Sequence, residues 1–87
     1  ARWIRTERDR LLPALAALPG VQAFASDANM ILLRVSDAAQ TFANMKMHGV
    51  LVKNVSGMHA MLSNCLRVTV GTEPENLLML EALKASL

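Results

Sequence analysis

One stretch decides the fold of this chain: Cys65-Leu66-Arg67-Val68-Thr69-Val70-Gly71-Thr72-Glu73-Pro74-Glu75-Asn76. A strand turns successive side chains to opposite faces, so every second residue from Leu66 to Val70 lies on one apolar face. Arg67 and Thr69 lie on the other face. A guanidinium is planar, permanently charged and forked, which suits bidentate binding of a carboxylate or a phosphate. The stretch therefore predicts an amphipathic strand over 65–70 with a candidate anion-binding arginine on its polar face, where the alternative is a side chain that only meets water.

A helix is expected to begin directly after this strand. Thr72 and Glu75 have the spacing of a capping box, and Pro74 falls in the first turn, where a missing N–H is tolerated. We therefore expect the strand to end at Gly71 and a helix to cover 73–86. Leucines at helical spacing are expected to form its inward face. They are Leu77, Leu80, Leu83 and Leu87.

The same periodicities predict the elements that come before this stretch. Helices are expected over 2–18 and from a cap at Ser36 or Asp37 to a stop at Gly49, and strands over 21–24, 29–35 and 50–55. Pro13 should kink or restart the first helix, and Ser26-Asp27 has the composition of a turn. The order α-β-β-α-β-β-α indicates one α+β domain over 1–87, with helices packed on a mainly antiparallel sheet of about four short strands.

Composition narrows the classes of function. The formal net charge of +2 and an aromatic content of 3% do not suit nucleic-acid binding, and the four arginines within the first ten residues are interpreted as a solvated helix face. The apolar runs are shorter than the ~20 residues that span a membrane. A single cysteine favours a reducing, cytoplasmic compartment. The hydrophobic content of 53% exceeds the usual ~45–50%, which suggests surface that meets another domain or subunit.

Four ordered segments carry a resemblance to a known family. They are Leu18-Pro19-Gly20-Val21, Ser26-Asp27-Ala28-Asn29, Gly49-Val50-Leu51-Val52-Lys53 and the stretch from Cys65 to Thr72. In this order and rough spacing they resemble the C-terminal part of histidinol-phosphate aminotransferases, fold-type I enzymes that use pyridoxal phosphate (PLP). The resemblance implies that 1–87 is the small C-terminal domain of a longer, dimeric enzyme whose large, PLP-binding domain is absent. It implies transamination between L-histidinol phosphate or its keto form and glutamate or 2-oxoglutarate, in histidine biosynthesis.

The resemblance also assigns candidate substrate-binding residues. Arg67 matches the arginine that grips the α-carboxylate of the substrate. Lys53 matches a position where many relatives carry an arginine near the substrate phosphate, and here the lysine keeps the charge without the fork; a solvated lysine at a strand end is the alternative. Asn29 matches the asparagine of the Ser-Asp-x-Asn segment, and its amide is expected to brace Arg67 or a nearby strand, or to be purely structural.

The residues that complete the chemistry are not expected in this chain. The family places its Schiff-base lysine after a Ser/Thr-x-x motif, but Ala43, Val50 and Glu81 occupy that position before Lys46, Lys53 and Lys84. His48 is interpreted as a helix-end residue, His59 as a loop residue and Cys65 as a small buried apolar residue, and none of them has metal-ligand spacing. We therefore expect no catalytic residue, no metal and no bound PLP in this chain alone, which should be inactive.

Two alternatives fit the same residues. Within fold-type I enzymes, an aromatic aminotransferase or a threonine-phosphate decarboxylase would carry a very similar domain. Outside the enzymes, the chain could be a stand-alone α+β binding or dimerisation module. A domain cut from a larger enzyme predicts an exposed apolar face and coding sequence upstream, whereas a stand-alone module predicts a start codon near Ala1 and a polar surface.

Overall fold

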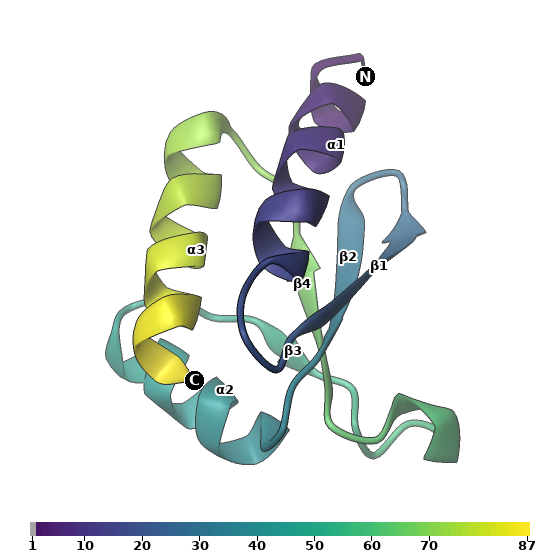
Figure 1. Cartoon of the computed structure of the whole chain (residues 1–87), viewed down its shortest axis with the longest axis vertical. Helices are drawn as coiled ribbons and strands as arrows, with labels where there is room; N and C mark the ends of the chain where they lie inside the picture. Colours follow the sequence, from purple (N-terminus) through teal and green to yellow (C-terminus); the bar gives the residue numbers. More distant parts are fainter. Residues whose placement is uncertain (1) are drawn as a thin grey trace.

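A computed structural model describes residues 2–87, in which helices cover one face of a four-stranded antiparallel sheet (Figure 1). The predicted α+β class and the order α-β-β-α-β-β-α are confirmed, with one short 3-10 turn added. The elements are α1 (Arg2–Ala16), β1 (Gln22–Asp27), β2 (Met30–Arg34), α2 (Ala38–Met47), β3 (Lys53–Asn54), η1 (Ala60–Leu62), β4 (Cys65–Thr69) and α3 (Glu73–Ser86).

The sheet has the order β1-β2-β4-β3, so β4 is paired on both sides. Its register places Leu32 of β2 opposite Arg67 and Lys53 of β3 opposite the same arginine. Because side chains alternate, Leu66 and Val68 point to the helices and are at most 1% exposed, as the sequence predicted. Arg67 lies on the opposite face, which the helices do not cover.

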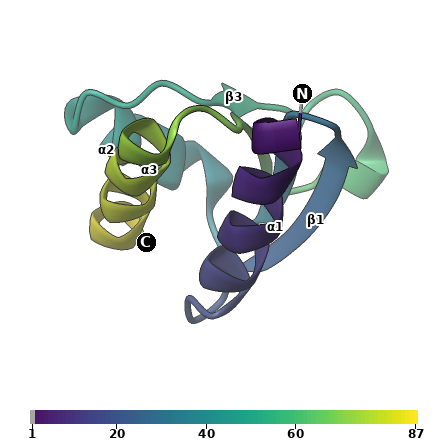
Figure 2. The ribbon, with the colours of Figure 1, turned by 90° about the horizontal axis from the view of Figure 1, so that it is seen from above.

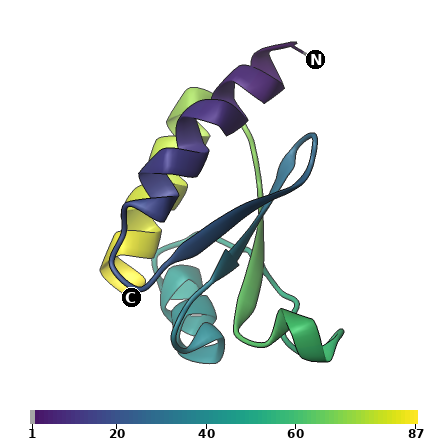
Figure 3. The ribbon, with the colours of Figure 1, turned by 45° about the vertical axis from the view of Figure 1, so that its right-hand side comes forward.

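The core lies between the inner face of the sheet and all three helices. α1 contacts β1 and β2, whereas α2 contacts β3, β4 and α3 (Figures 2 and 3). The largest side chains that are fully buried are Leu15, Ile31, Leu33, Met45, Leu66 and Leu83. The loop that contains η1 projects on the other side of the sheet, away from α1 and α3 (Figure 3). No helix within residues 2–87 combines the length and the apolar character that a membrane crossing requires.

The first hairpin turns two residues later than predicted. β1 continues through Ser26-Asp27, and Ala28-Asn29 form the turn. The register shifts between Ala25 and Asp27, so the polar pair is accommodated as an irregularity in the strand. The Asp27 carboxylate then accepts a hydrogen bond from the Ala28 N–H at 2.7 Å, which satisfies the start of the turn.

The third strand is shorter than the predicted 50–55 because the preceding helix end uses part of it. Gly49 has a positive φ of 79°, as a helix stop requires, and its N–H donates to the Lys46 carbonyl. The Val50 N–H donates to the Met45 carbonyl in the same motif. The chain therefore pairs with β4 from Lys53 onward: Lys53 and Asn54 form β3, and the Val55 N–H donates to the Cys65 carbonyl. The residues between are left to line a cavity described below.

The inward face of α3 is rotated from the predicted one, which is right for Leu83 and, in part, for Leu80, since Leu80 packs against the core. Its buried residues are Asn76, Met79, Ala82, Leu83 and Ser86. Of the predicted leucines only Leu83 is buried, while Leu77 is 54% and Leu87 51% exposed. The rotation follows from Asn76, whose amide bonds to the backbone of Gly71 and so must face inward.

α1 passes Pro13 without restarting and ends at Ala16 (Figure 3). Proline deprives only the Asp9 carbonyl of its helical donor, and Asp9 is exposed, so water can replace that donor. Arg8 departs from the predicted solvated face: its side chain is only 23% exposed, and its Nη1 lies 3.5 Å from the Asp27 carbonyl.

Candidate functional site

A cavity of about 510 Å³ opens beside the two-residue strand β3. One wall is the segment 49–53, the second is β4 from Arg67 to Thr69, and the third is the start of α3. We call this cavity the cleft. The cap of α2 binds the Val50 N–H, and β3 pairs with β4 only from Lys53 onward, which leaves the edge of β4 beyond Arg67 without a β3 partner. The α3 wall consists of Glu75, Leu78 and Met79.

The cleft brings together the two predicted cationic residues. Lys53 and Arg67 are direct cross-strand partners and both line it. Like charges opposite each other on neighbouring strands destabilise a sheet. The ion pairs found within residues 2–87 use Arg8, Arg10 and Lys84, not these two side chains. Arg67 is half-buried and Lys53 exposed, so the fold holds two positive charges side by side at an open cleft.

Glu75 is the acidic residue of the cleft wall, and its carboxylate is already bound. It accepts hydrogen bonds from the N–H and from the hydroxyl of Thr72, each at 2.9 Å. These bonds, the backbone one first, lower the pKa of Glu75 below its ordinary value. A Cβ at Gly71 would lie 2.7 Å from Oε1 of Glu75, so a side chain there would require the Glu75 carboxylate to move.

Sequence reasoning identified Glu75 only as a helix cap and missed its place in the cleft. The signal was available, because a residue in the first turn of a helix that directly follows a strand stays close to that strand. Both hydrogen bonds of the Glu75 carboxylate fall on Oε1, and none of the ion pairs found within residues 2–87 joins it to Lys53 or Arg67.

Asn29 lies outside the cleft. It is in the turn between β1 and β2, one residue before Met30, and its carbonyl accepts a hydrogen bond from the Val70 N–H at 2.7 Å. This bond extends the pairing of β2 and β4 by one step beyond Met30 and Thr69. The structure thus gives Asn29 a backbone role next to β4.

The histidines and the cysteine have local partners, in the positions predicted for them. Nδ1 of His48 lies 2.8 Å from the Asn44 carbonyl at the end of α2. His59 is in the loop, where its Nδ1 accepts a hydrogen bond from the Met61 N–H. Cys65 is 2% exposed. Among residues 2–87, no three His, Cys, Asp or Glu side chains are grouped to hold a metal ion.

The described residues do not make a PLP site by themselves. The cofactor needs a lysine for its aldehyde, a carboxylate for its ring nitrogen and backbone donors for its phosphate. Lys53 shares the cleft with one carboxylate, Glu75, which is bound to Thr72. The first turn of α3 carries Glu73 and Glu75, whose charges oppose the attraction of a helix N-terminus for phosphate.

Comparison with known proteins identifies relatives along the whole chain, although no protein-family model matches it. A histidinol-phosphate aminotransferase from Methylibium petroleiphilum is 56% identical over 87 residues, which is 100% of this chain and 24% of that protein. The chain spans about a quarter of the length of the curated relatives it matches. Its sequence is therefore similar, from end to end, to one part of a histidinol-phosphate aminotransferase.

Solved structures share the fold. A histidinol-phosphate aminotransferase from Clostridium acetobutylicum superposes with a TM-score of 0.87 at 21% identity, over 97% of this chain and 26% of that one. An L-threonine-O-3-phosphate decarboxylase from Porphyromonas gingivalis gives a TM-score of 0.86 at 24% identity, over 97% of this chain and 27% of that one. The backbone is thus common to proteins of different named activity.

Proposed function

We propose, from its end-to-end similarity to a quarter of histidinol-phosphate aminotransferases, that this chain is the C-terminal, substrate-recognising domain of such an enzyme. The parent would be a cytoplasmic homodimer of histidine biosynthesis that uses PLP, with the cofactor held by residues outside this chain. The observation that carries the proposal is the pair Lys53 and Arg67, two cations that share the cleft without a carboxylate partner.

Arg67 would bind the carboxylate of the amino-group donor. The guanidinium can place two parallel N–H groups against two carboxylate oxygens, which fixes both the position and the orientation of the amino acid. Orientation matters because the amine must reach the cofactor at a defined angle, and fixed geometry lowers the barrier substantially. The half-buried position of Arg67 limits the water that competes for its donors.

Lys53 would supply a second, less directional positive charge. Its ammonium is a point charge on a flexible stem, and it is exposed at the rim of the cleft. This arrangement suits a phosphate, which presents oxygens in several directions. A substrate that carries a phosphate would thus bind more tightly because of Lys53, while the binding of a substrate with a carboxylate alone would depend on Arg67.

A chimeric enzyme tests the proposal. The 87 residues would replace the matching segment of the Methylibium relative, and transamination between histidinol phosphate and 2-oxoglutarate would be measured. We expect an active chimera in which Arg67→Ala lowers kcat/KM for glutamate by about 100-fold. Normal kinetics in Arg67→Ala would refute the role of Arg67.

Two further measurements separate the alternatives. Lys53→Met should raise KM for histidinol phosphate more than KM for glutamate, and equal effects on both would remove Lys53 from phosphate recognition. A chimera that folds, binds PLP and lacks transamination would favour a decarboxylase or an aromatic aminotransferase. A chimera that does not fold would favour the stand-alone module.

A further inference from the structure

The residue after Glu75 closes the turn between β4 and α3. Asn76 is 5% exposed, and its carboxamide makes two hydrogen bonds to Gly71: the Gly71 N–H donates to Oδ1 at 2.9 Å, and Nδ2 donates to the Gly71 carbonyl at 3.0 Å. A single side chain therefore satisfies both backbone groups of the residue that ends the strand of Arg67. The turn cannot open without breaking both bonds.

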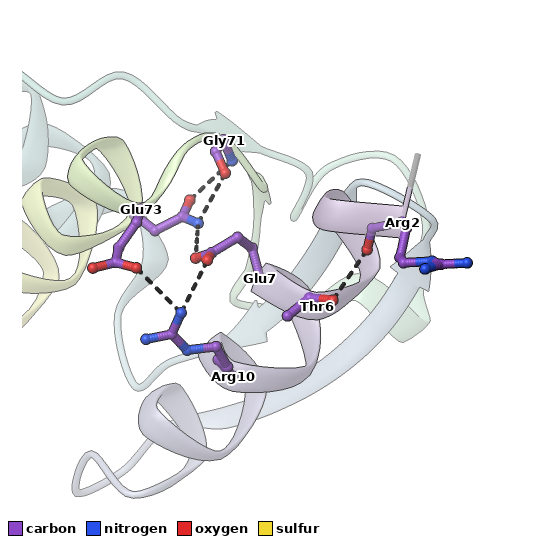
Figure 4. A network of polar contacts seen from close by, with 7 residues as sticks. Arg2, Thr6, Glu7, Arg10, Gly71 and Glu73 are labelled. Carbon is purple, nitrogen blue, oxygen red and sulfur yellow. Dashed lines mark hydrogen bonds and ion pairs between the residues drawn. The ribbon is translucent and has the colours of Figure 1, made fainter.

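The same amide ties this turn to α1. Nδ2 of Asn76 also donates to Oε2 of Glu7 at 3.2 Å. Arg10 holds Glu7 at 3.2 Å and Glu73 at 3.1 Å, so α1 grips the first turn of α3 at two points (Figure 4). The Glu7 side chain is only 15% exposed, so its bond to Asn76 is shielded from water. Arg10 and Glu73, by contrast, are exposed and form a surface pair.

α3 contributes both to this network and to the cleft. Its first turns present Glu75, Leu78 and Met79 to the cleft, while Asn76, on the same buried face as Met79, donates to Glu7. A helix turn is rigid, so a shift of Asn76 moves the cleft wall by a similar amount. The position of that wall relative to Arg67 thus depends on the contacts of Asn76.

We infer that Asn76 is a positioning residue: through Gly71 and Glu7 it holds the α3 wall of the cleft at the distance from Arg67 that a bound carboxylate requires. The inference rests on the proposed function of the cleft. Asn76 touches no substrate. It acts through Glu75, Leu78 and Met79, and it links the cleft geometry to the angle of α1.

The test is Asn76→Asp in the chimeric enzyme. Aspartate has nearly the same shape, but it cannot donate to Gly71 or Glu7, and it places a second carboxylate beside that of Glu7. We expect KM for glutamate to rise about tenfold while kcat changes much less, since a misplacement of about 1 Å is enough for such a loss. Adding Glu7→Gln supplies a donor to the new aspartate and should recover at least half of the loss on a logarithmic scale.

Asn44→Asp is the matched control. The amide of Asn44, in α2, lies 3.5 Å from the carbonyl of Ser86, at the end of α3 opposite to Asn76. We expect this change to lower the thermal midpoint with little effect on KM. In the 87-residue chain, Asn76→Asp should also speed amide exchange at Gly71, and Asn44→Asp should not.

The outcomes are distinct. A rise in KM with Asn76→Asp that Glu7→Gln partly reverses supports the inference. Equal KM effects from Asn76→Asp and Asn44→Asp, or no rescue, overturn it while the role of Arg67 stands. If Arg67→Ala in the same chimera leaves KM for glutamate unchanged, the proposed function fails, and the inference fails with it.

Discussion

Arg34 and Arg67 lie on the same face of neighbouring strands, yet their guanidinium groups have different surroundings. Arg34 of β2 donates from Nε to the Ser63 carbonyl at 3.2 Å and from Nη2 to the Met61 carbonyl at 2.5 Å. It fastens the loop with η1 over that end of the sheet. Arg67, on β4, lines the cleft with Lys53 and is absent from the side-chain hydrogen bonds found within residues 2–87.

The difference shows what makes an arginine structural. Both residues are half-buried, and both alternate with apolar neighbours in a strand, so their sequence patterns are alike. Arg34 is opposite Cys65, next to a loop that offers free carbonyls, whereas Arg67 is opposite a second cation. The loop, not the strand, therefore decides which arginine is free for a ligand.

Stability measurements should separate the two arginines most clearly. Arg34→Met removes a charged donor from two backbone carbonyls, and we expect it to lower the free energy of unfolding by about 1–2 kcal/mol. Arg67→Met removes no such partner and should leave that free energy unchanged or slightly higher. The free energies of unfolding of the two variants would be measured in urea. A larger loss in Arg67→Met than in Arg34→Met would contradict the contrast between the two arginines.

Replacing Arg34 or Arg67 with lysine tests whether the bidentate geometry of the guanidinium matters. In the chimeric enzyme, Arg67→Lys keeps the charge but loses bidentate geometry, so kcat/KM for glutamate should fall about tenfold, or about 1.4 kcal/mol. Arg34→Lys should leave kcat/KM close to that of the parent chimera, because Arg34 does not line the cleft. Equal losses from both changes would mean that Arg67 acts only through the local structure.

Removal of the charge opposite Arg67 should stabilise the domain slightly. Lys53→Met relieves a like-charge cross-strand pair, for which we expect a gain of about 0.2–1 kcal/mol at low salt that shrinks as salt screens the charges. Lys84→Met is the matched control, since Lys84 pairs with Glu81 at 3.5 Å and its loss should be neutral or slightly destabilising. A stabilisation of the same sign and size in both variants would contradict the repulsion.

Much of this arrangement is predictable from sequence, and the limits have physical causes. Alternation from Leu66 to Val70 fixes the buried face of β4, because burial is a local property of a strand. The rotation of α3 escaped prediction because its leucines suggested one face while the bonds of Asn76 to Gly71 imposed another. The small residues Ala82 and Ser86 on the observed inner face were the available signal.

The cleft itself was beyond pattern analysis. It depends on the cap of α2 holding Val50 away from β4, which no periodicity reveals, since 50–55 has the apolar character of a strand. Arg67 and Lys53 could be selected as candidates from resemblance and residue type. Their direct pairing could not, because it needs the register of two strands that are not joined by a tight turn.

The smallest expected effect is on the loss of stability in acid that depends on Glu75, and it tests whether Arg67 pairs with that carboxylate. Glu75 has a pKa lowered by its bonds to Thr72, so it adds stability above its ordinary pKa that is lost as pH falls through the lower, folded value. Glu75→Gln should abolish this part of the acid-induced loss. If Thr72 is the partner, Arg67→Met leaves the Glu75-dependent loss intact, and Thr72→Val reduces it. If instead Arg67→Met removes that loss, Arg67 is engaged with Glu75, and the contrast with Arg34 disappears.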